Sequence, residues 1–147
     1  PLTGEAREAG ARFARELLAR PAPAGKPFCL LAGGETTVAV RGRGRGGRNQ
    51  ELVLGAAGVL DGRPGALVLS AGTDGNDGPT DAAGAFADGG TLARARSLGL
   101  DAARALREND AYPFFQRLAD LVATGPTRTN VMDVQIGLRR PAAGAPR

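Results

Sequence analysis

Apolar residues recur along the first twenty positions at the spacing of an amphipathic helix. From Thr3 to Arg20 they fall on one stripe of a 3.6-residue repeat. The Thr3 hydroxyl can cap the first turn, and Pro21 follows the last residue, where a helix has to stop. The pattern therefore predicts a helix over Thr3–Arg20, followed by a connector of Pro, Ala and Gly over Pro21–Pro27.

Shorter runs further along predict strands. Phe28–Ala32 is apolar and ends at a Gly pair, and Thr36–Arg41 is rich in β-branched residues, so we expect the two to form a hairpin. Ala66–Leu69 is continuously apolar, which is typical of a strand covered on both faces. Val131–Leu138 alternates like a final strand. Helical spacing returns in five segments: Asn49–Leu60, Ala82–Ala87 after an Asp81 cap, Thr91–Ser97, Asp101–Glu108 and Tyr112–Val122.

Strands that alternate with helices favour the α/β class. We expect a layered α/β/α domain with a mixed β-sheet, because the hairpin adds an antiparallel pair. The length of 147 residues is that of one ordinary domain. The predicted domain occupies residues 1–140, and residues 141–147 are expected to form a flexible tail.

Composition excludes several classes of function. The 19 basic residues are Lys26 and arginines, and the net charge is +4, but the many Ala and Gly residues point to a GC-rich genome that favours Arg codons. Aromatic residues make up only 4%, which is poor material for base stacking, so no nucleic-acid partner is expected. The sequence has no His and only Cys29, which excludes His-based catalysis, an intramolecular disulfide and the common zinc sites. Its apolar runs are too short to cross a membrane and no signal peptide is visible, so we expect a cytoplasmic protein.

The run Arg41–Arg48 alternates Arg with Gly between a predicted strand and a predicted helix. It has the composition of an RGG-type RNA-binding segment, and Gly42, Gly44 and Gly47 also match the dinucleotide fingerprint G-x-G-x-x-G. The interpretation that we favour is an anion cradle. Its backbone amides and the N-terminus of the next helix would face the ligand, and Arg48 would offer a bidentate fork. A solvated loop without a ligand is the remaining alternative.

The segment Ser70–Asp81 follows the apolar strand, and ligands of open α/β sheets bind at such strand ends. Asp74, Asp77 and Asp81 could orient a hydroxyl, act as a base or hold Mg²⁺. Turn chemistry alone explains the same composition, with Asp81 as a helix cap.

Two further segments carry polar side chains. In Thr124–Asp133 the hydroxyl groups, Asn130 and Asp133 could reach a polar ligand, or the segment could be a plain loop before an edge strand. Glu35 could lie near a site or belong only to the predicted hairpin turn.

Taken together, four motifs resemble one family. They are Gly33-Gly-Glu-Thr-Thr-Val-x-Val40, Gly46-Gly-Arg-Asn-Gln-Glu51, Ser70-Ala-Gly-Thr-Asp-Gly-x-Asp-Gly-Pro-Thr-Asp-Ala-Ala-Gly84 and Thr124-Gly-Pro-Thr-x-Thr-Asn-Val131. In this order and spacing they resemble the C-terminal (MOFRL) domain of the two-domain glycerate kinases, over about Glu5 to Leu138. Some members are labelled hydroxypyruvate reductases, so an NAD(P)H-dependent reductase domain is one alternative, and a stand-alone anion- or RNA-binding module is another.

The resemblance implies phosphorylation of glycerate to 2-phosphoglycerate with ATP and Mg²⁺, in a cleft against an N-terminal nucleotide-binding domain. By that similarity Arg48 would neutralise the phosphates or the glycerate carboxylate, and Asp74 would orient or deprotonate the attacking hydroxyl. The other substrate- or phosphate-binding candidates are Glu35, Gly44, Gly46, Gly47, Asn49, Thr73, Asp77, Thr127 and Asn130. ATP and Mg²⁺ would be bound mainly by the N-terminal domain, and no metal ligands are expected in this chain. Because that domain and its catalytic lysine are absent here, we expect little or no kinase turnover from the chain alone.

Three positions depart from the family's usual pattern. Asn76 stands in place of an apolar residue, Arg128 in place of Gly, and Met132 in place of a polar residue. Arg128 is expected to crowd or recharge its loop.

Overall fold

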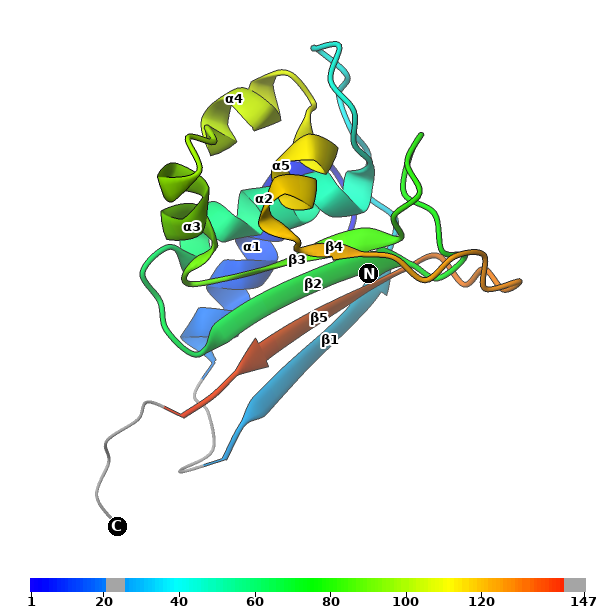
Figure 1. Ribbon diagram of the computed structural model, residues 1–147. Helices are drawn as coiled ribbons and strands as arrows, with labels where there is room; N and C mark the ends of the chain where they lie inside the picture. Colours follow the sequence, from blue (N-terminus) through cyan, green and yellow to red (C-terminus); the bar gives the residue numbers. More distant parts are fainter. Residues whose placement is uncertain (21–25, 142–147) are drawn as a thin grey trace.

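Five strands form one sheet in the order β1-β5-β2-β3-β4 (Figure 1). The computed structural model describes residues 1–20 and 26–141. The strands are β1 (Phe28–Gly34), β2 (Ala66–Gly72), β3 (Gly84–Asp88), β4 (Leu121–Val122) and β5 (Asp133–Arg139). The helices are α1 (Ala6–Ala19), α2 (Arg48–Leu60), α3 (Thr91–Ser97), α4 (Ala102–Arg107) and α5 (Ala111–Leu118).

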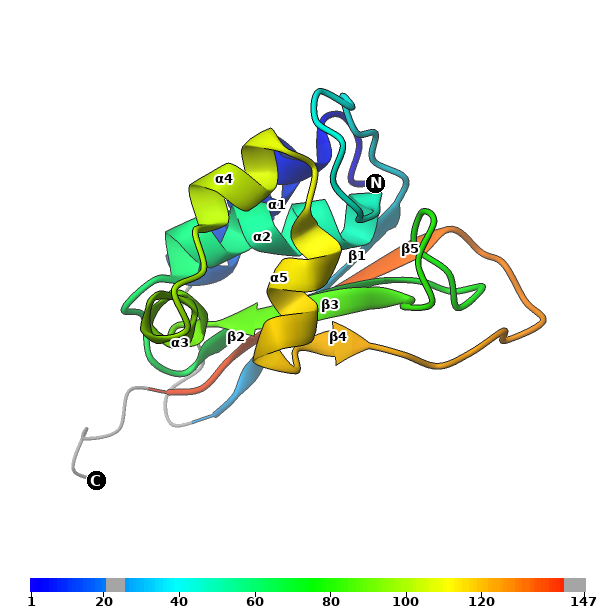
Figure 2. The same cartoon turned by 45° about the horizontal axis from the view of Figure 1, so that its top comes forward.

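The helices lie on one face of the sheet, and α2 runs across its middle (Figures 1 and 2). The core fills the space between α1, α2 and the strands, with Phe13, Leu17, Leu52 and Val68 fully or almost fully buried. Along β5, buried residues alternate with partly exposed ones, so only one side of the strand contributes to this core.

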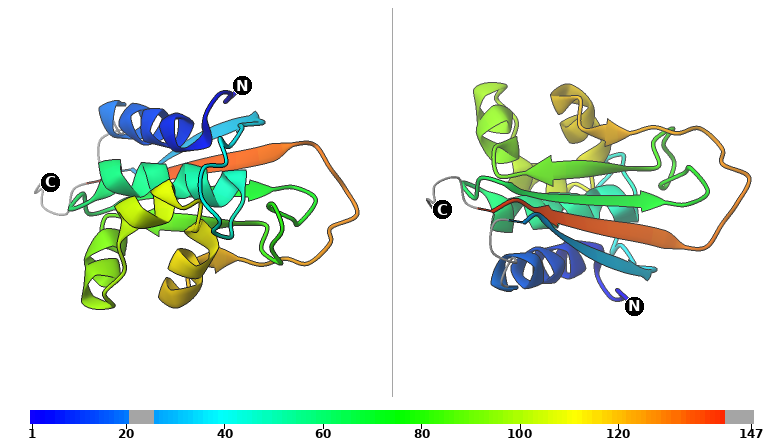
Figure 3. Two further views of the ribbon diagram at one scale, coloured as in Figure 1. Left: turned by 90° about the horizontal axis from the view of Figure 1, so that it is seen from above. Right: turned by 90° about the horizontal axis from the view of Figure 1, so that it is seen from below.

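The α/β class is confirmed, but two details of the predicted sheet differ. Neighbouring strands are antiparallel throughout, and parallel pairing among the described residues is limited to the isolated bridges Leu2–Gly34 and Glu5–Thr37. The described part of the chain forms two layers instead of α/β/α, because each helix packs on the same face (Figure 3). β5 returns antiparallel between β1 and β2, so no parallel crossover is needed.

Three local predictions are wrong for identifiable reasons. Ala82–Ala87 was expected to be helical, but Gly84–Asp88 is a strand, because its backbone pairs with β2 and this tertiary contact overrides the helix preference of alanine. Thr36–Arg41 forms no strand, since Thr37 pairs with the N-terminal segment at Gly4 and Ala6. The last predicted helix ends at Leu118, where Ala119 has a left-handed backbone (φ 60°) and β4 follows.

The remaining helices are confirmed with small shifts. The first helix begins at Ala6, and Glu5, not Thr3, stands at its N-cap. Residues 21–25 of the predicted connector and 142–147 of the predicted tail lie outside the described residues. Within the described part of the chain, each helix falls short of the length and hydropathy that a bilayer crossing requires.

Candidate anion-binding site at the end of the sheet

The candidate site lies where β1 and β2 end and β5 begins. Gly34, Asp133 and Gly72 are neighbours across these three strands. The helix α2 begins at Arg48 beside the same end of the sheet, because Arg48 reaches Asp133 directly. Residues from three of the four motifs therefore meet at one end of the domain, together with Asp133, which follows the fourth motif by two residues.

Arg48 is fixed by a buried carboxylate. Its Nε donates to Asp133 Oδ2 at 2.6 Å, and its Nη2 donates to Asp133 Oδ1 at 2.9 Å. Glu35 Oε1 lies 3.4 Å from the same Nη2 and is largely exposed. The hydrogen bond to Asp133 raises the pKa of Arg48 above its usual range, although burial opposes this. Arg48 is therefore a fixed cation whose predicted bidentate fork is already taken by Asp133. Among the described residues, its Nη1 has no acceptor.

The N-terminus of α2 is also occupied. Asp77 Oδ1 accepts from the backbone and side-chain amides of Asn49 at 3.0 and 3.2 Å, and Oδ2 accepts from the Gln50 amide at 2.9 Å. Burial raises the pKa of Asp77 above its usual range, although these three hydrogen bonds oppose the shift. Asp77 thus caps the helix that was expected to bind a ligand anion, and the Asn49 side chain in turn accepts from Ser70 on β2.

Most amides of the glycine loop (residues 41–47) point at the turn between α4 and α5. Asn109 Oδ1 accepts from Arg41 and Gly42 at 2.7 and 2.9 Å, and the Glu108 carbonyl accepts from Gly44 at 2.8 Å. A Cβ on Gly42 would lie 2.3 Å from the Glu108 backbone, so this packing requires glycine. Close backbone packing therefore explains the glycines at positions 42 and 44, and the amide of Gly44 is not available to an anion.

A cavity of about 620 Å³ remains beside Arg48. Its wall includes Arg48, Glu35, Gly46 and Gly47, and its apolar part includes Val38 and Val40. The structure thus brings together Arg48, Glu35, Gly46 and Gly47 from the predicted set, and Gly44 borders the same space. The two carboxylates of the wall, Glu35 and Glu51, pair with Arg48 and Arg7. Arg48 is therefore a fixed cation with an open Nη1 beside an apolar wall, an arrangement that suits a small organic anion.

The other predicted site residues lie in two interleaved loops, 72–80 and 124–132. Thr73 Oγ1 donates to the Met132 carbonyl at 2.6 Å and accepts from the Val131 amide at 2.8 Å. The Thr127 hydroxyl donates to the Thr73 carbonyl, and Asn130 Oδ1 accepts from the Met132 amide. These contacts hold the loops in place, and none of the side chains of Thr73, Thr127 and Asn130 lines the cavity.

Asp74 lies near the start of the first of these loops. It is two residues after Gly72, which is the register neighbour of Asp133 across β2 and β5. One carboxylate oxygen accepts from the Asn76 amide at 2.9 Å in an Asx turn. Its other oxygen has no donor among the described residues, so Asp74 keeps one acceptor for a ligand. In the second loop, Arg128 and Met132 have φ values of 61° and 70°, a backbone region that disfavours both side chains.

Sequence reasoning missed the residues that hold the glycine loop in place. Asn109 contacts the loop with its Oδ1 and the buried Glu51 with its Nδ2, and Glu51 also pairs with Arg7 at 2.9 Å. The local signal was an Asn directly after the predicted helix Asp101–Glu108, a position where a left-handed residue is common. The structure gives Asn109 a φ of 54°.

Tyr112 ties the same loop to the acidic segment. The Arg45 guanidinium lies 4.2 Å from the centre of the Tyr112 ring, and the Tyr112 hydroxyl donates to Asp81 at 2.6 Å. This hydrogen bond lowers the pKa of Asp81 and raises that of Tyr112. Asp81 is thus a partner of Tyr112, and the helix that it was expected to cap is a strand.

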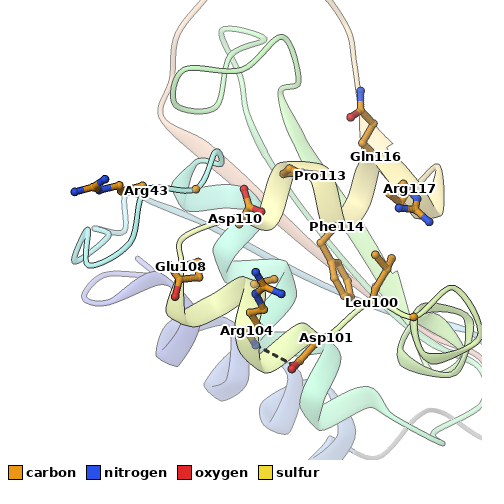
Figure 4. Close-up of a pocket in the computed structure, with 13 residues that line it drawn as sticks. Arg43, Leu100, Asp101, Arg104, Glu108, Asp110, Pro113, Phe114, Gln116 and Arg117 are labelled. Carbon is orange, nitrogen blue, oxygen red and sulfur yellow. Dashed lines mark hydrogen bonds between the residues drawn. The ribbon is translucent and has the colours of Figure 1, made fainter.

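A second cavity, of about 580 Å³, lies between the glycine loop, α4 and α5 (Figure 4). Figure 4 places Arg104 in its middle, while Arg43 and Arg117 project from opposite ends. Its three arginines are matched by Asp101, Glu108 and Asp110, and Gly44 is the only predicted site residue in its wall, against five in the wall of the cavity beside Arg48. The cavity beside Arg48 is the better candidate.

The described residues include no group of three or more Asp, Glu or Cys side chains arranged to hold a metal ion. The two buried carboxylates nearest to Arg48 already accept from N–H donors, Asp77 from α2 and Asp133 from Arg48. The described residues therefore offer no preformed cage of protein ligands for Mg²⁺, which the resemblance places mainly in the N-terminal domain.

Comparison with known proteins agrees with the motif resemblance. The model of the MOFRL family matches residues 28–133, and the chain belongs to this family. D-Glycerate 2-kinase from Thermotoga maritima is 50% identical over 137 residues, which are 91% of this chain and 33% of that protein. A protein from Agrobacterium vitis, named provisionally as a hydroxypyruvate reductase, is 46% identical over 139 residues, which are 91% of this chain and 36% of its own length.

A solved structure has the same fold. The crystal structure of glycerate kinase from Thermotoga maritima superposes with a TM-score of 0.88 at 47% identity, over 94% of this chain and 34% of that one. The chain thus spans about a third of the length of these relatives.

Proposed function

We propose that this chain is the part of an ATP-dependent glycerate kinase that supplies a substrate-anion site centred on Arg48. The observation that carries the proposal is the pairing of Arg48 with buried Asp133, which fixes the guanidinium beside a cavity and leaves Nη1 open. Phosphoryl transfer depends mainly on positioning and charge neutralisation, and a fixed cation supplies both. Gly44, Gly46 and Gly47 of the glycine loop form part of the wall of the cavity beside Arg48.

In the proposed reaction Nη1 of Arg48 binds the glycerate carboxylate or the phosphoryl group in transfer. A glycerate hydroxyl oxygen forms the new bond to phosphorus, and the bond to the ADP oxygen breaks. The hydroxyl proton passes to the open oxygen of Asp74, which lies outside the cavity wall and takes this role by the family resemblance. The product is 2-phosphoglycerate. Glu35 lies 3.4 Å from Nη2 of Arg48, so its carboxylate weakens the positive potential that an anion at Nη1 would meet.

The proposal assigns ATP and Mg²⁺ to polypeptide beyond this chain, in an N-terminal nucleotide-binding domain. One observation supports this: relatives are about three times as long as this chain. The chain alone is therefore expected to have little or no turnover. A cytoplasmic location stays a prediction.

The reductase alternative is favoured only by the name of one relative. The amides of Gly42 and Gly44, which a dinucleotide fingerprint would turn toward pyrophosphate, donate instead to Asn109 and Glu108. Oxidation of NADH with hydroxypyruvate by the encoded polypeptide would support that alternative.

The decisive experiment compares two matched arginines in the polypeptide as its gene encodes it. Arg94 forms a similar pair with buried Asp120, at 2.6 and 3.1 Å, away from the cavity. Arg48→Ala is expected to lower kcat for ATP-dependent glycerate phosphorylation about 100-fold or more, as the loss of a charge-stabilising donor does. Arg94→Ala should weaken folding to a similar degree with little change in kcat. Equal effects of the two variants on kcat would refute the role of Arg48.

A further inference from the structure

The face of the sheet that points away from the helices is apolar across four strands. Leu31, Ile136, Leu69 and Phe86 are direct neighbours in register from β1 through β5 and β2 to β3. None of these four side chains belongs to the core cluster under the helices. They form one continuous row on the opposite side.

Two further rows extend this open face. One row lies two residues toward the start of β1 and contains Cys29, Leu138 and Leu67. The other lies two residues toward the end of β1 and contains Val134 and Ala71. Leu31 is 66% exposed and Leu138 is 45% exposed. In the view from below, no described helix crosses this face (Figure 3, right). The only charged residue in these rows is Asp88, at the end of β3.

An apolar face of this extent is unusual for an antiparallel sheet in contact with water, whose outer face is normally polar. Contiguous exposed apolar patches of this kind mark interaction surfaces. The open face thus has the apolar composition of a buried surface, and the continuous apolar run of β2 is typical of a strand covered on both faces.

The size of the open face favours a covalently linked partner over a second copy. Strands of this length are ~22 Å long and lie ~4.8 Å apart, so four of them offer roughly 400 Å². A stable complex between separate chains buries about 800 Å² on each partner. A segment of the same polypeptide avoids the free-energy cost of association and needs less area. Relatives carry about two thirds of their length outside the region matched by this chain.

We infer that the open face packs against a further layer of the same polypeptide, from outside residues 1–147, which presents an apolar helical stripe. This layer would convert the two-layer domain into three layers and would end beside Asp133 at the candidate site. The inference rests on one part of the proposed function, the additional polypeptide, and on none of its chemistry.

Cys29 makes the inference testable, because it is the single cysteine of this chain and is exposed on the open face. Its reaction with a thiol reagent is measured in the 147-residue chain and in the polypeptide as its gene encodes it, with Cys29 followed by peptide mass spectrometry. We expect labelling to be at least tenfold slower in the encoded polypeptide. Equal rates in the two proteins would overturn the inference. Protection that appears in the 147-residue chain only at high concentration, with dimers in sedimentation, would also overturn it in favour of a second copy.

A matched pair of variants separates the open face from general stability. Leu31→Lys in the encoded polypeptide should restore labelling of Cys29 toward the rate of the short chain. Leu98→Lys replaces an exposed leucine, 45% exposed, at the end of α3 and should leave labelling unchanged. Circular dichroism verifies that both variants are folded. If Leu31→Lys leaves Cys29 protected, the inference fails. Labelling needs no turnover, so a protected Cys29 in a polypeptide without kinase activity would refute the proposed function alone.

Discussion

Substitution of Asn109 separates two contributions to the position of the glycine loop. The side chain accepts from Arg41 and Gly42 at 2.7 and 2.9 Å and donates to the Ala39 carbonyl at 3.3 Å and to the Glu51 carboxylate. Its backbone has a φ of 54°, which asparagine and glycine tolerate better than alanine. The hydrogen bonds and the backbone strain can therefore be measured one at a time.

The expected magnitudes follow from these contacts. Asn109→Gly keeps the backbone conformation but removes four hydrogen bonds, each with a net value of about 1 kcal/mol, and the Ala39 bond is long. We expect the free energy of unfolding to fall by about 3 kcal/mol. Asn109→Ala adds ~1–2 kcal/mol of left-handed strain, partly offset by the lower entropy of its unfolded chain. It should be about 0.5–1 kcal/mol less stable than the glycine variant.

Asn109→Asp gives a third, pH-dependent result. It retains an acceptor for Arg41 and Gly42 but turns a carboxylate oxygen toward Glu51, which is buried. Two carboxylates in contact repel when both are ionised, so this variant should lose more stability at pH 7 than at pH 4, where one of them is protonated.

The assay is urea unfolding followed by circular dichroism at pH 7, with the pH 4 measurement added for the aspartate variant. The reasoning is refuted if Asn109→Gly lies within 0.5 kcal/mol of the parent, or if the alanine variant is the more stable of the two. In the first case the loop would not depend on this turn. In the second the left-handed backbone would carry no cost.

Three other predictions concern stability. Arg128→Gly should raise the free energy of unfolding by about 0.5–1 kcal/mol in urea titrations, because glycine relieves the left-handed backbone at φ 61°; a destabilised variant would contradict this. Asp77→Ala should cost about 2–3 kcal/mol, against about 1 kcal/mol for Asp101→Ala, because buried Asp77 accepts three hydrogen bonds at its helix start and exposed Asp101 accepts one. Equal losses in a thermal melt would argue against this. The Tyr112 hydroxyl lowers the pKa of Asp81, so this carboxylate stabilises the fold above its unfolded pKa of 3.8, and that stability is lost as the pH falls below it. Tyr112→Phe should therefore flatten the decline in urea midpoint between pH 5 and 3, and an unchanged slope would count against the coupling.

The helices with a clear apolar stripe could be predicted from the sequence, and the strand β3 could not. In α1 the side chains that meet the core recur at helical spacing, so the local pattern carries the information. In β3 the residues around Gly84 are mostly alanine, and their local preference is helical. Only the hydrogen bonds to β2, which are formed in the tertiary structure, make the segment extended.

The candidate site shows the same limit. Motif spacing identified Arg48 and Asp77, because both stand next to a helix start or a strand end. It could not show that Asp77 is used up as a helix cap, since that depends on a contact with Asn49, 28 residues away in sequence. The pairing of Arg48 with Asp133 spans 85 residues and follows from the register of β5, for which the sequence has no local signal.

The place of β5 in the sheet has a consequence for how the chain folds during synthesis. β5 leaves the ribosome after the other four strands of its sheet, yet it lies between β1 and β2 and is hydrogen-bonded to both. Until residues 133–139 emerge, β1 has no neighbouring strand to complete it, and its apolar residues stay available to other nascent chains. The sheet can close only after residues 133–139 have been synthesised, so chains truncated before Asp133 are expected to aggregate instead of folding.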